Sequence, residues 1–193
     1  LVKLVLAKPW LDIAAMAGRA LLAVLTALGL VMFSWLYRRP LASRPRALIV
    51  LAGMLLIPVL IGNIFLDLWA NYPETFVLGL VGITLAILFG GGIALVVCVL
   101  VSLLLGFMGE NDLQLAMISL AGAVAGIFAI RRADRATQFL FAGFATALAV
   151  FVTGMIWRLT SQIALSWEGT LTTLTFAGIN GSIAGVMALG IHN

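Results

Sequence analysis

Long apolar runs separated by short polar segments are the feature that most constrains the fold of this chain. Charged residues make up only 9% of the 193 residues, and hydrophobic residues make up 64%. Roughly a quarter of the residues of a soluble domain are charged, so this chain lacks the polar groups to solvate a soluble globular surface. The pattern predicts an all-α integral membrane protein. The apolar runs are 13–37, 47–69, 76–108, 113–130, 138–157 and 171–191.

The run 76–108 is too long for a single crossing. As one helix its 33 residues would extend about 50 Å, against a hydrocarbon core of about 30 Å. Its middle holds Gly90, Gly91 and Gly92, and successive glycines favour a turn because they lack side chains. We predict two short helices, 76–89 and 93–108, and a bundle of about seven transmembrane helices. One kinked helix, with six in total, is the alternative.

Basic residues cluster in two segments between the apolar runs. With seven helices and the N-terminus outside, both clusters and the glycine turn face the cytoplasm. Cytoplasmic loops are enriched in Lys and Arg, so the charges favour seven helices with a cytoplasmic C-terminus. Six helices would place the clusters on opposite sides of the membrane. The clustered residues, which we expect to set the topology, are Arg38, Arg39, Arg44, Arg46, Arg131, Arg132 and Arg135.

The termini complete the predicted organisation. We expect residues 1–12 to form an outer interfacial segment, 13–191 the polytopic helical domain and 192–193 a cytoplasmic end. The chain begins with Leu rather than Met and has no signal peptide before its first run, so we expect a further helix or extracellular domain to precede it. The pI of about 10 reflects the arginine clusters and indicates membrane topology rather than a nucleic-acid partner.

Polar side chains inside the predicted helices are candidates for a functional site, because the bilayer interior penalises them. Arg19 and Asp67 would lie at similar depth if the first two helices are antiparallel neighbours. They would then form an ion pair, or each would reach the outer headgroups instead. Asn63 follows Pro58, which tends to kink a helix. Asn63 and Asn180 can hydrogen-bond between helices or contact a ligand.

Small residues recur at four-residue spacing in two of the later runs. Gly122 and Gly126 form one such pair, and Gly181 and Gly185 form another that Gly178 extends. This spacing lets helix backbones approach closely in a membrane. It predicts tight packing, either within one chain or between the copies of a homodimer.

The sequence offers few groups for catalysis. Cys98 and His192 are the sole Cys and His of the chain, so a Cys/His metal site within one chain is excluded. Cys98 lies in an apolar run, which is typical of a buried hydrophobic residue. No phosphate-binding, zinc-protease or nucleophile-elbow motif is present. We predict no catalytic residue and no cofactor in this chain, and we expect bound lipid.

The order of these features resembles a known family. The stretches that carry the resemblance are Leu36-Tyr-Arg-Arg-Pro-Leu-Ala-Ser-Arg-Pro-Arg-Ala47, Ile87-Leu-Phe-Gly-Gly-Gly-Ile-Ala-Leu95, Ala129-Ile-Arg-Arg-Ala-Asp-Arg-Ala-Thr-Gln138 and Ala177-Gly-Ile-Asn-Gly-Ser-Ile-Ala-Gly185. Over about residues 15–191 the chain is similar to the membrane domain of bacterial seven-transmembrane receptors with an intracellular HD phosphohydrolase domain. The resemblance implies a bacterial cytoplasmic membrane, an extracellular domain before the helices and a metal-dependent HD domain after them.

Characterised members of that family resemble cyclic-di-AMP phosphodiesterases, and their catalytic His–Asp pairs belong to the cytoplasmic domain. No catalytic residue therefore transfers to this chain. The first hypothesis is a non-catalytic sensor and anchor module of such a phosphodiesterase, within a homodimer. The second is an accessory structural subunit that packs against other membrane subunits, lipid or pigment. The third is the substrate-binding membrane component of a vitamin transporter, although the chain lacks the polar midplane pocket that such a site needs.

Overall fold

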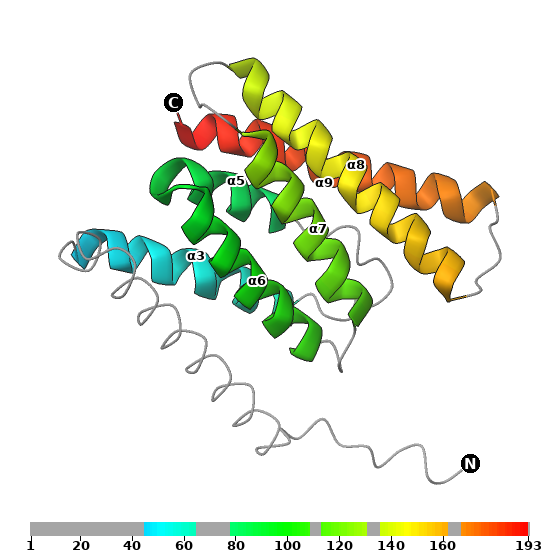
Figure 1. Cartoon of the computed structure of the whole chain (residues 1–193), viewed down its shortest axis with the longest axis horizontal. Coiled ribbons are helices and arrows are strands. Elements are labelled where there is room, and N and C mark those ends of the chain that lie inside the picture. The colour runs from blue at the N-terminus through cyan, green and yellow to red at the C-terminus, as the bar shows by residue number, and fades with distance from the viewer. Residues whose placement is uncertain (1–44, 65–77, 109–112, 131–135, 162–166, 193) are drawn as a thin grey trace, which may run out of the picture.

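The computed structural model of the chain is helical in nearly all of its described residues, which are 45–64, 78–108, 113–130, 136–161 and 167–192. These ranges contain six helices, and Figure 1 shows how they are arranged. The predicted runs 47–69, 113–130, 138–157 and 171–191 each overlap one helix, and the run 76–108 overlaps two. The helices are α3 (Pro45–Ile64), α5 (Leu78–Phe89), α6 (Gly91–Met108), α7 (Leu113–Ala129), α8 (Ala136–Thr160) and α9 (Trp167–His192).

Three of these helices are long and apolar enough to cross a membrane: α6, α8 and the Trp167–Gly190 part of α9. The other three carry shorter apolar stretches, Ile49–Gly62, Leu78–Phe89 and Leu113–Ala129. The predicted helix 13–37 lies outside the described residues. Within the described residues the fold is all-helical, while the total of seven crossings and the orientation stay predictions.

Gly90 divides the long apolar run into two helices, as the glycine cluster predicted. It has a φ of 91°, a left-handed conformation that strongly favours glycine. Its N–H donates to the Ala86 carbonyl at the end of α5, and its carbonyl accepts from the Ala94 N–H at the start of α6. One residue thus ends α5 and begins α6. The two helices then pack against each other as a hairpin, with Gly82 beside Cys98.

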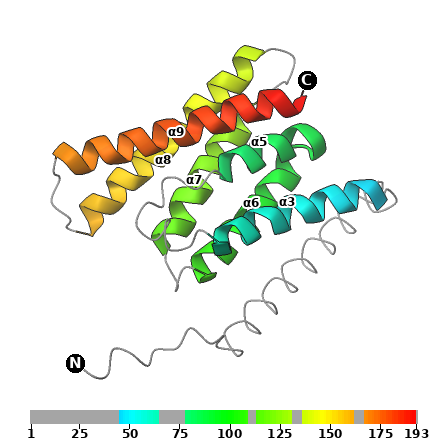
Figure 2. The same ribbon diagram turned by 180° about the vertical axis from the view of Figure 1, so that it is seen from behind.

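The short helix α5 lies at the centre of the described bundle. Its 12 residues span only about 18 Å, and it packs against α6, α7 and α9 and more lightly against α3 and α8. Figures 1 and 2 place α3 at one end of the bundle and the α8–α9 pair at the other. A helix too short to cross alone is thus packed between longer neighbours.

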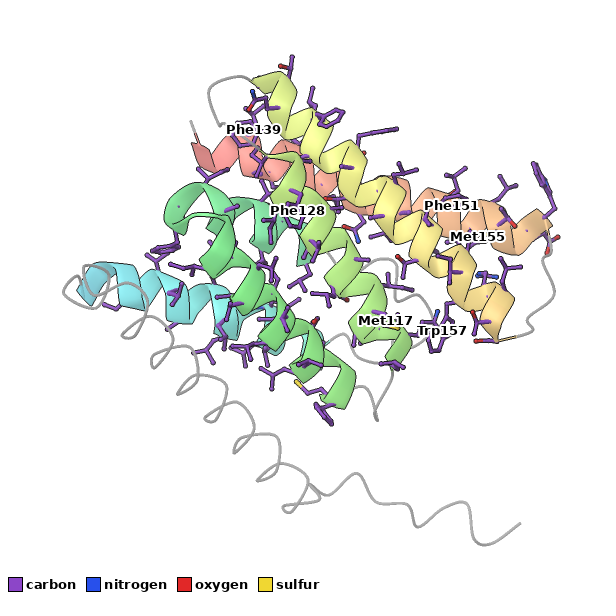
Figure 3. All side chains as sticks on the ribbon, in the orientation of Figure 1. Met117, Phe128, Phe139, Phe151, Met155 and Trp157 are labelled. Carbon is purple, nitrogen blue, oxygen red and sulfur yellow. The ribbon has the colours of Figure 1, made fainter. Side chains whose placement is uncertain are left out.

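The buried side chains form clusters that join these helices. The largest cluster unites α3, α5, α6 and α7 and includes Leu55, Leu85, Cys98 and Leu105. A second joins α5 through Ile83 to α8 and α9, and it contains the fully buried Phe139, which is labelled in Figure 3. Cys98 therefore has the environment of a core hydrophobic residue, as its apolar surroundings in the sequence indicated.

Large apolar side chains cover the outer surface of the described helices. Figure 3 shows side chains projecting outward along α8 and α9. Phe128 and Phe144 are each 67% exposed and Ile49 is 71% exposed. A water-soluble monomer rarely exposes apolar patches on this scale, whereas lipid covers such surfaces in a membrane. The exposed side chains agree with the predicted membrane bundle.

Candidate functional site

The contact between α8 and α9 is built from glycines whose backbones touch. A Cβ on Gly143 of α8 would strike the carbonyl oxygen of Gly181 of α9 and come within 3.0 Å of the Gly185 Cα. A Cβ on Gly181 would strike the Gly143 carbonyl oxygen, and one on Gly185 would lie 2.9 Å from the Phe139 carbonyl oxygen. Real Cβ atoms essentially never approach so closely, so these helices can pack this tightly only with glycine at these positions.

The predicted pair Gly122 and Gly126 on α7 faces α8 and α5. A Cβ on Gly122 would lie 2.8 Å from Val150 of α8, and a Cβ on Gly126 would lie 2.8 Å from the Thr146 hydroxyl and 2.9 Å from Ile83. Both small-residue pairs that the sequence singled out therefore lie at contacts within one chain. Neither pair is free to pack against a second copy of the chain.

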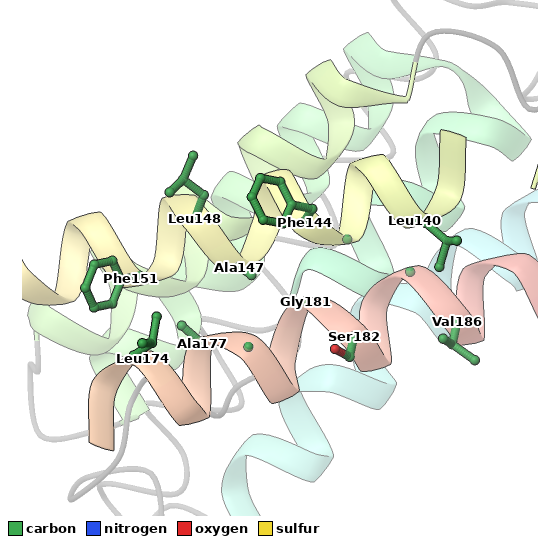
Figure 4. Close-up of a pocket in the computed structure, with 13 residues that line it drawn as sticks. Leu140, Phe144, Ala147, Leu148, Phe151, Leu174, Ala177, Gly181, Ser182 and Val186 are labelled. Carbon is green, nitrogen blue, oxygen red and sulfur yellow. The ribbon is translucent and has the colours of Figure 1, made fainter. Parts of the chain in front are cut away.

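Gly178 differs from these glycines. No atom lies within 4 Å of a Cβ built at Gly178, so the close contacts of α8 and α9 do not extend to it. Instead it lines an apolar groove of about 350 Å³ on the outer side of the α8–α9 pair. Figure 4 shows this groove between the two helices, with Phe144 and Leu148 on α8 and Leu174, Ser182 and Val186 on α9.

Six buried polar side chains lie within the described helices: Thr84, Ser102, Ser119, Thr146, Thr173 and Asn180. Three of them donate a hydrogen bond to a backbone carbonyl of their own helix. The acceptors are the carbonyls of Val99 for Ser102, Ala142 for Thr146 and Gly169 for Thr173.

Two other hydroxyls are buried without such bonds. Thr84 on α5 and Ser119 on α7 are 2% and 1% exposed, and neither hydroxyl has a hydrogen-bond partner in the described structure. A buried hydroxyl without a partner costs free energy. These two positions are therefore energetically unfavourable in the arrangement seen here.

The predicted candidate Asn180 is 1% exposed on α9. It lies one turn from Ala177, which packs with Ile118 and Val150, and one turn from Ala184, which packs with Ile83. Asn180 is thus held among helices rather than facing the groove. Whether Asn180 hydrogen-bonds between helices or contacts a ligand stays a prediction.

Several other predicted residues fall outside the described structure. Arg19 and Asp67, together with Arg38, Arg39, Arg44 and the cluster Arg131, Arg132 and Arg135, are not in the described ranges. Arg46, which we expected in the loop before the second run, instead lies in the first turn of α3, and Asn63 lies in its last turn. The ion pair and the topology stay predictions.

The sequence analysis did not predict Gly143, Thr84 or Ser119 as site residues. Gly143 and Ala147 have the same four-residue spacing as the predicted glycine pairs, so this signal was present in the sequence. The two hydroxyls gave no such signal, because a Ser or Thr in a membrane helix usually bonds to its own backbone. Only the packing of α5 and α7 determines whether these hydroxyls find a partner.

The described helices thus offer close backbone contacts, an apolar groove and a few hydroxyls. No group of three His, Cys, Asp or Glu residues that could hold a metal occurs among the described residues. The model of one family, the 7TM receptor with intracellular HD hydrolase, matches residues 13–192. The chain belongs to this family. No curated protein and no solved structure was found to match this receptor domain.

The family assignment agrees with the resemblance that the sequence motifs carried, and it extends over nearly the whole chain. It establishes a membrane receptor domain of a family whose members carry an intracellular HD hydrolase. Together with the apolar helices, it makes this chain a multi-pass membrane protein.

Proposed function

We propose that this receptor domain is the non-catalytic transmembrane sensor and anchor module of an HD-type signalling phosphodiesterase in the bacterial cytoplasmic membrane. The observation that carries the proposal is the family match over residues 13–192, because the family description joins a 7TM receptor to an intracellular HD hydrolase. The sequence resemblance implies cyclic-di-AMP as the substrate of that hydrolase. An outer N-terminus and a cytoplasmic C-terminus would place the hydrolase inside the cell.

The packing of α9 supports a role in transmitting a signal. In the proposed protein α9 leads toward the hydrolase domain, and it is joined to α8 by the backbone contacts of Gly143, Gly181 and Gly185. Close-packed helices move as units rather than deforming continuously. A displacement of α8 against α7 would therefore carry α9 with it. Signal transmission in this proposal is a shift of the α8–α9 pair relative to α5 and α7.

The experiment uses the full product of the natural gene in membrane vesicles. Gly122→Ala places a Cβ 2.8 Å from Val150 and pushes α7 away from α8. We expect it to change the rate of cyclic-di-AMP hydrolysis several-fold at equal protein content. Gly190→Ala is the matched control, because no atom lies within 4 Å of a Cβ there, and it should leave the rate unchanged.

Two outcomes would contradict parts of the proposal. If the hydrolase is active and Gly122→Ala has no effect on its rate, the membrane domain is an anchor without a sensing role. If the gene product contains no HD hydrolase domain, the whole proposal fails. Purification of the chain at fixed stoichiometry in a larger assembly would then favour the accessory-subunit hypothesis.

A further inference from the structure

The side chain of Thr146 on α8 fills a socket that three glycines of two other helices line. A Cβ on Gly79 of α5 would strike the Thr146 γ-methyl. On α7, a Cβ on Gly122 would lie 3.5 Å from that methyl, and one on Gly126 would lie 2.8 Å from the hydroxyl. Thr146 is fully buried, and its hydroxyl donates to the Ala142 carbonyl of its own helix. The hydroxyl thus keeps this hydrogen bond wherever α8 moves, and shape fits the side chain to the socket.

Val150 repeats the shape of Thr146 one turn farther along α8. Both side chains are β-branched, and they differ only in a methyl group that replaces the hydroxyl. Val150 is 1% exposed and packs with Ile118 of α7, and a Cβ on Gly122 would lie 2.8 Å from it. The surface of α7 therefore meets two side chains of nearly the same shape, one helical turn apart.

α9 carries a matching repeat on the side that faces α5. Ala184 and Ala188 are both buried in one cluster with Ile83 of α5. Because α8 and α9 run in opposite directions (Figure 1), a joint shift that carries Thr146 to the place of Val150 would carry α9 the same way. Ala188 would then take the place of Ala184. The shift therefore replaces each of these side chains by one of the same or nearly the same shape.

The Ser119 hydroxyl would gain from such a shift. Ser119 lies on α7 between Ile118 and Gly122, is 1% exposed, and has no hydrogen-bond partner in the described part of the chain. Thr146 in the place of Val150 would come beside it, and a hydroxyl that donates to one carbonyl can still accept a hydrogen bond. The shift would thus remove the cost of burying a hydroxyl without a partner.

We propose that the α8–α9 pair has a second register on α5 and α7, shifted by one helical turn, in which the Ser119 hydroxyl donates to the Thr146 hydroxyl. Such a step is about 5.4 Å, and packed elements move past one another by steps of this size because each side chain must leave one hole and enter the next. The inference rests on the proposed function, since it names the movement by which the α8–α9 pair would transmit a signal. The register itself can be measured without the hydrolase.

Disulfide cross-linking of the full-length protein in membranes measures the register as loss of free thiols. In a background without native cysteines, which includes Cys98→Ala, Ile118→Cys with Val150→Cys reports the register seen here. Ile118→Cys with Thr146→Cys reports the shifted one. The matched control pairs Ile118→Cys with Thr153→Cys, the same substitution on the same side of α8 but beyond Val150 instead of before it. We expect the Thr146 pair to cross-link at least fivefold faster than the Thr153 pair.

Each outcome of this experiment decides a different point. If the Thr146 pair reacts no faster than the Thr153 pair, the second register does not exist and the proposal fails. If the Val150 pair does not react, the packing from which the shift starts is wrong, which also overturns the proposal. If both registers are trapped and the two disulfides give the same rate of cyclic-di-AMP hydrolysis, the register shift holds and the sensor function fails.

Two substitutions that keep the shape of the side chains test the hydrogen bond. Ser119→Ala and Thr146→Val each remove one of its groups, so each should change the hydrolysis rate of the full-length protein about two- to tenfold, the factor that one hydrogen bond is worth. The double variant should differ no more than either single variant, because the bond is already lost. Ser102→Ala is the control, since that hydroxyl bonds within α6, and it should leave the rate unchanged.

Additive effects of Ser119→Ala and Thr146→Val would show that the two hydroxyls do not meet. If neither substitution changes the rate in a protein whose two disulfides do change it, the hydrogen bond is likewise overturned.

Discussion

At the scale of single residues, the glycines of this domain differ in how much space surrounds them. We expect Gly143→Ala to destabilise the folded domain by about 1–3 kcal/mol, which is typical of overpacking. Its new Cβ would strike the Gly181 carbonyl oxygen, and neither helix backbone can yield without moving the other. Thermal unfolding of the purified protein in detergent measures this change.

Gly190→Ala serves as the control for that substitution. It adds the same methyl group where no atom lies within 4 Å, and alanine favours a helix over glycine by about 1 kcal/mol. Its melting temperature should therefore equal or exceed that of the unsubstituted protein. Equal melting temperatures for Gly143→Ala and the unsubstituted protein would mean that α8 and α9 do not touch as described.

Substitutions that remove the buried hydroxyls of Thr84 and Ser119 are expected to stabilise the domain, whereas Gly143→Ala destabilises it. Thr84→Val and Ser119→Ala each remove a polar group that is buried without a partner and keep nearly the same shape. We expect each to stabilise the domain by about 1 kcal/mol, because the desolvation cost of the hydroxyl disappears. Chemical unfolding in detergent, with the exposed Thr160→Val as a control, measures the effect. A loss of stability would show that these hydroxyls are paired, for example through a bound water.

At the scale of elements, the hairpin of α5 and α6 depends on one of three successive glycines. Gly90→Ala should destabilise the domain by about 1–2 kcal/mol, the usual penalty for a left-handed residue with a Cβ. Gly90→Asn should cost less, since asparagine tolerates this conformation better. Gly92→Ala is the matched control, because Gly92 is helical and has open space around it. Equal melting temperatures for all three variants would contradict the turn at Gly90.

The hairpin also determines the place of α5 in the bundle. A helix of 12 residues cannot span the hydrocarbon core, so it gains stability only from its neighbours. Its buried residues Leu78, Gly79, Gly82 and Ile83 lie against α6, α7, α8 and α9. Substitutions that weaken these contacts should therefore destabilise the packing of several helices at once.

At the scale of the whole molecule, the arginine clusters predict which side of the membrane each loop faces. Cysteines introduced at Leu41 and Ala133 should react with a membrane-impermeant maleimide only after the cells are broken. Cysteines at Asp112 and Ala164 should react in intact cells, because seven helices place these positions outside. Labelling of Leu41→Cys and Ala133→Cys on opposite sides would support six crossings instead.

The sequence alone determined that this chain is a helical membrane protein of the HD-hydrolase receptor family. Apolar runs of about 20 residues predict membrane-spanning helices, since every backbone group must be satisfied within the membrane. The glycine cluster also located the division of the long run, because glycine adopts the left-handed conformation of Gly90 without a steric penalty. These features depend on neighbours in the sequence, and the structure agrees with them.

Only the tertiary structure decided which small residues pack within the chain and which remain open. Gly178 and Gly181 belong to the same run of small residues in the sequence, yet Gly181 touches α8 and Gly178 lines an open groove. Likewise Ser119 and Thr146 are both buried hydroxyls, but only Thr146 reaches a carbonyl. In lipid no polarity difference marks a buried face, because the membrane is as apolar as the core. Which face of each helix is buried is therefore decided by the helices that pack against it.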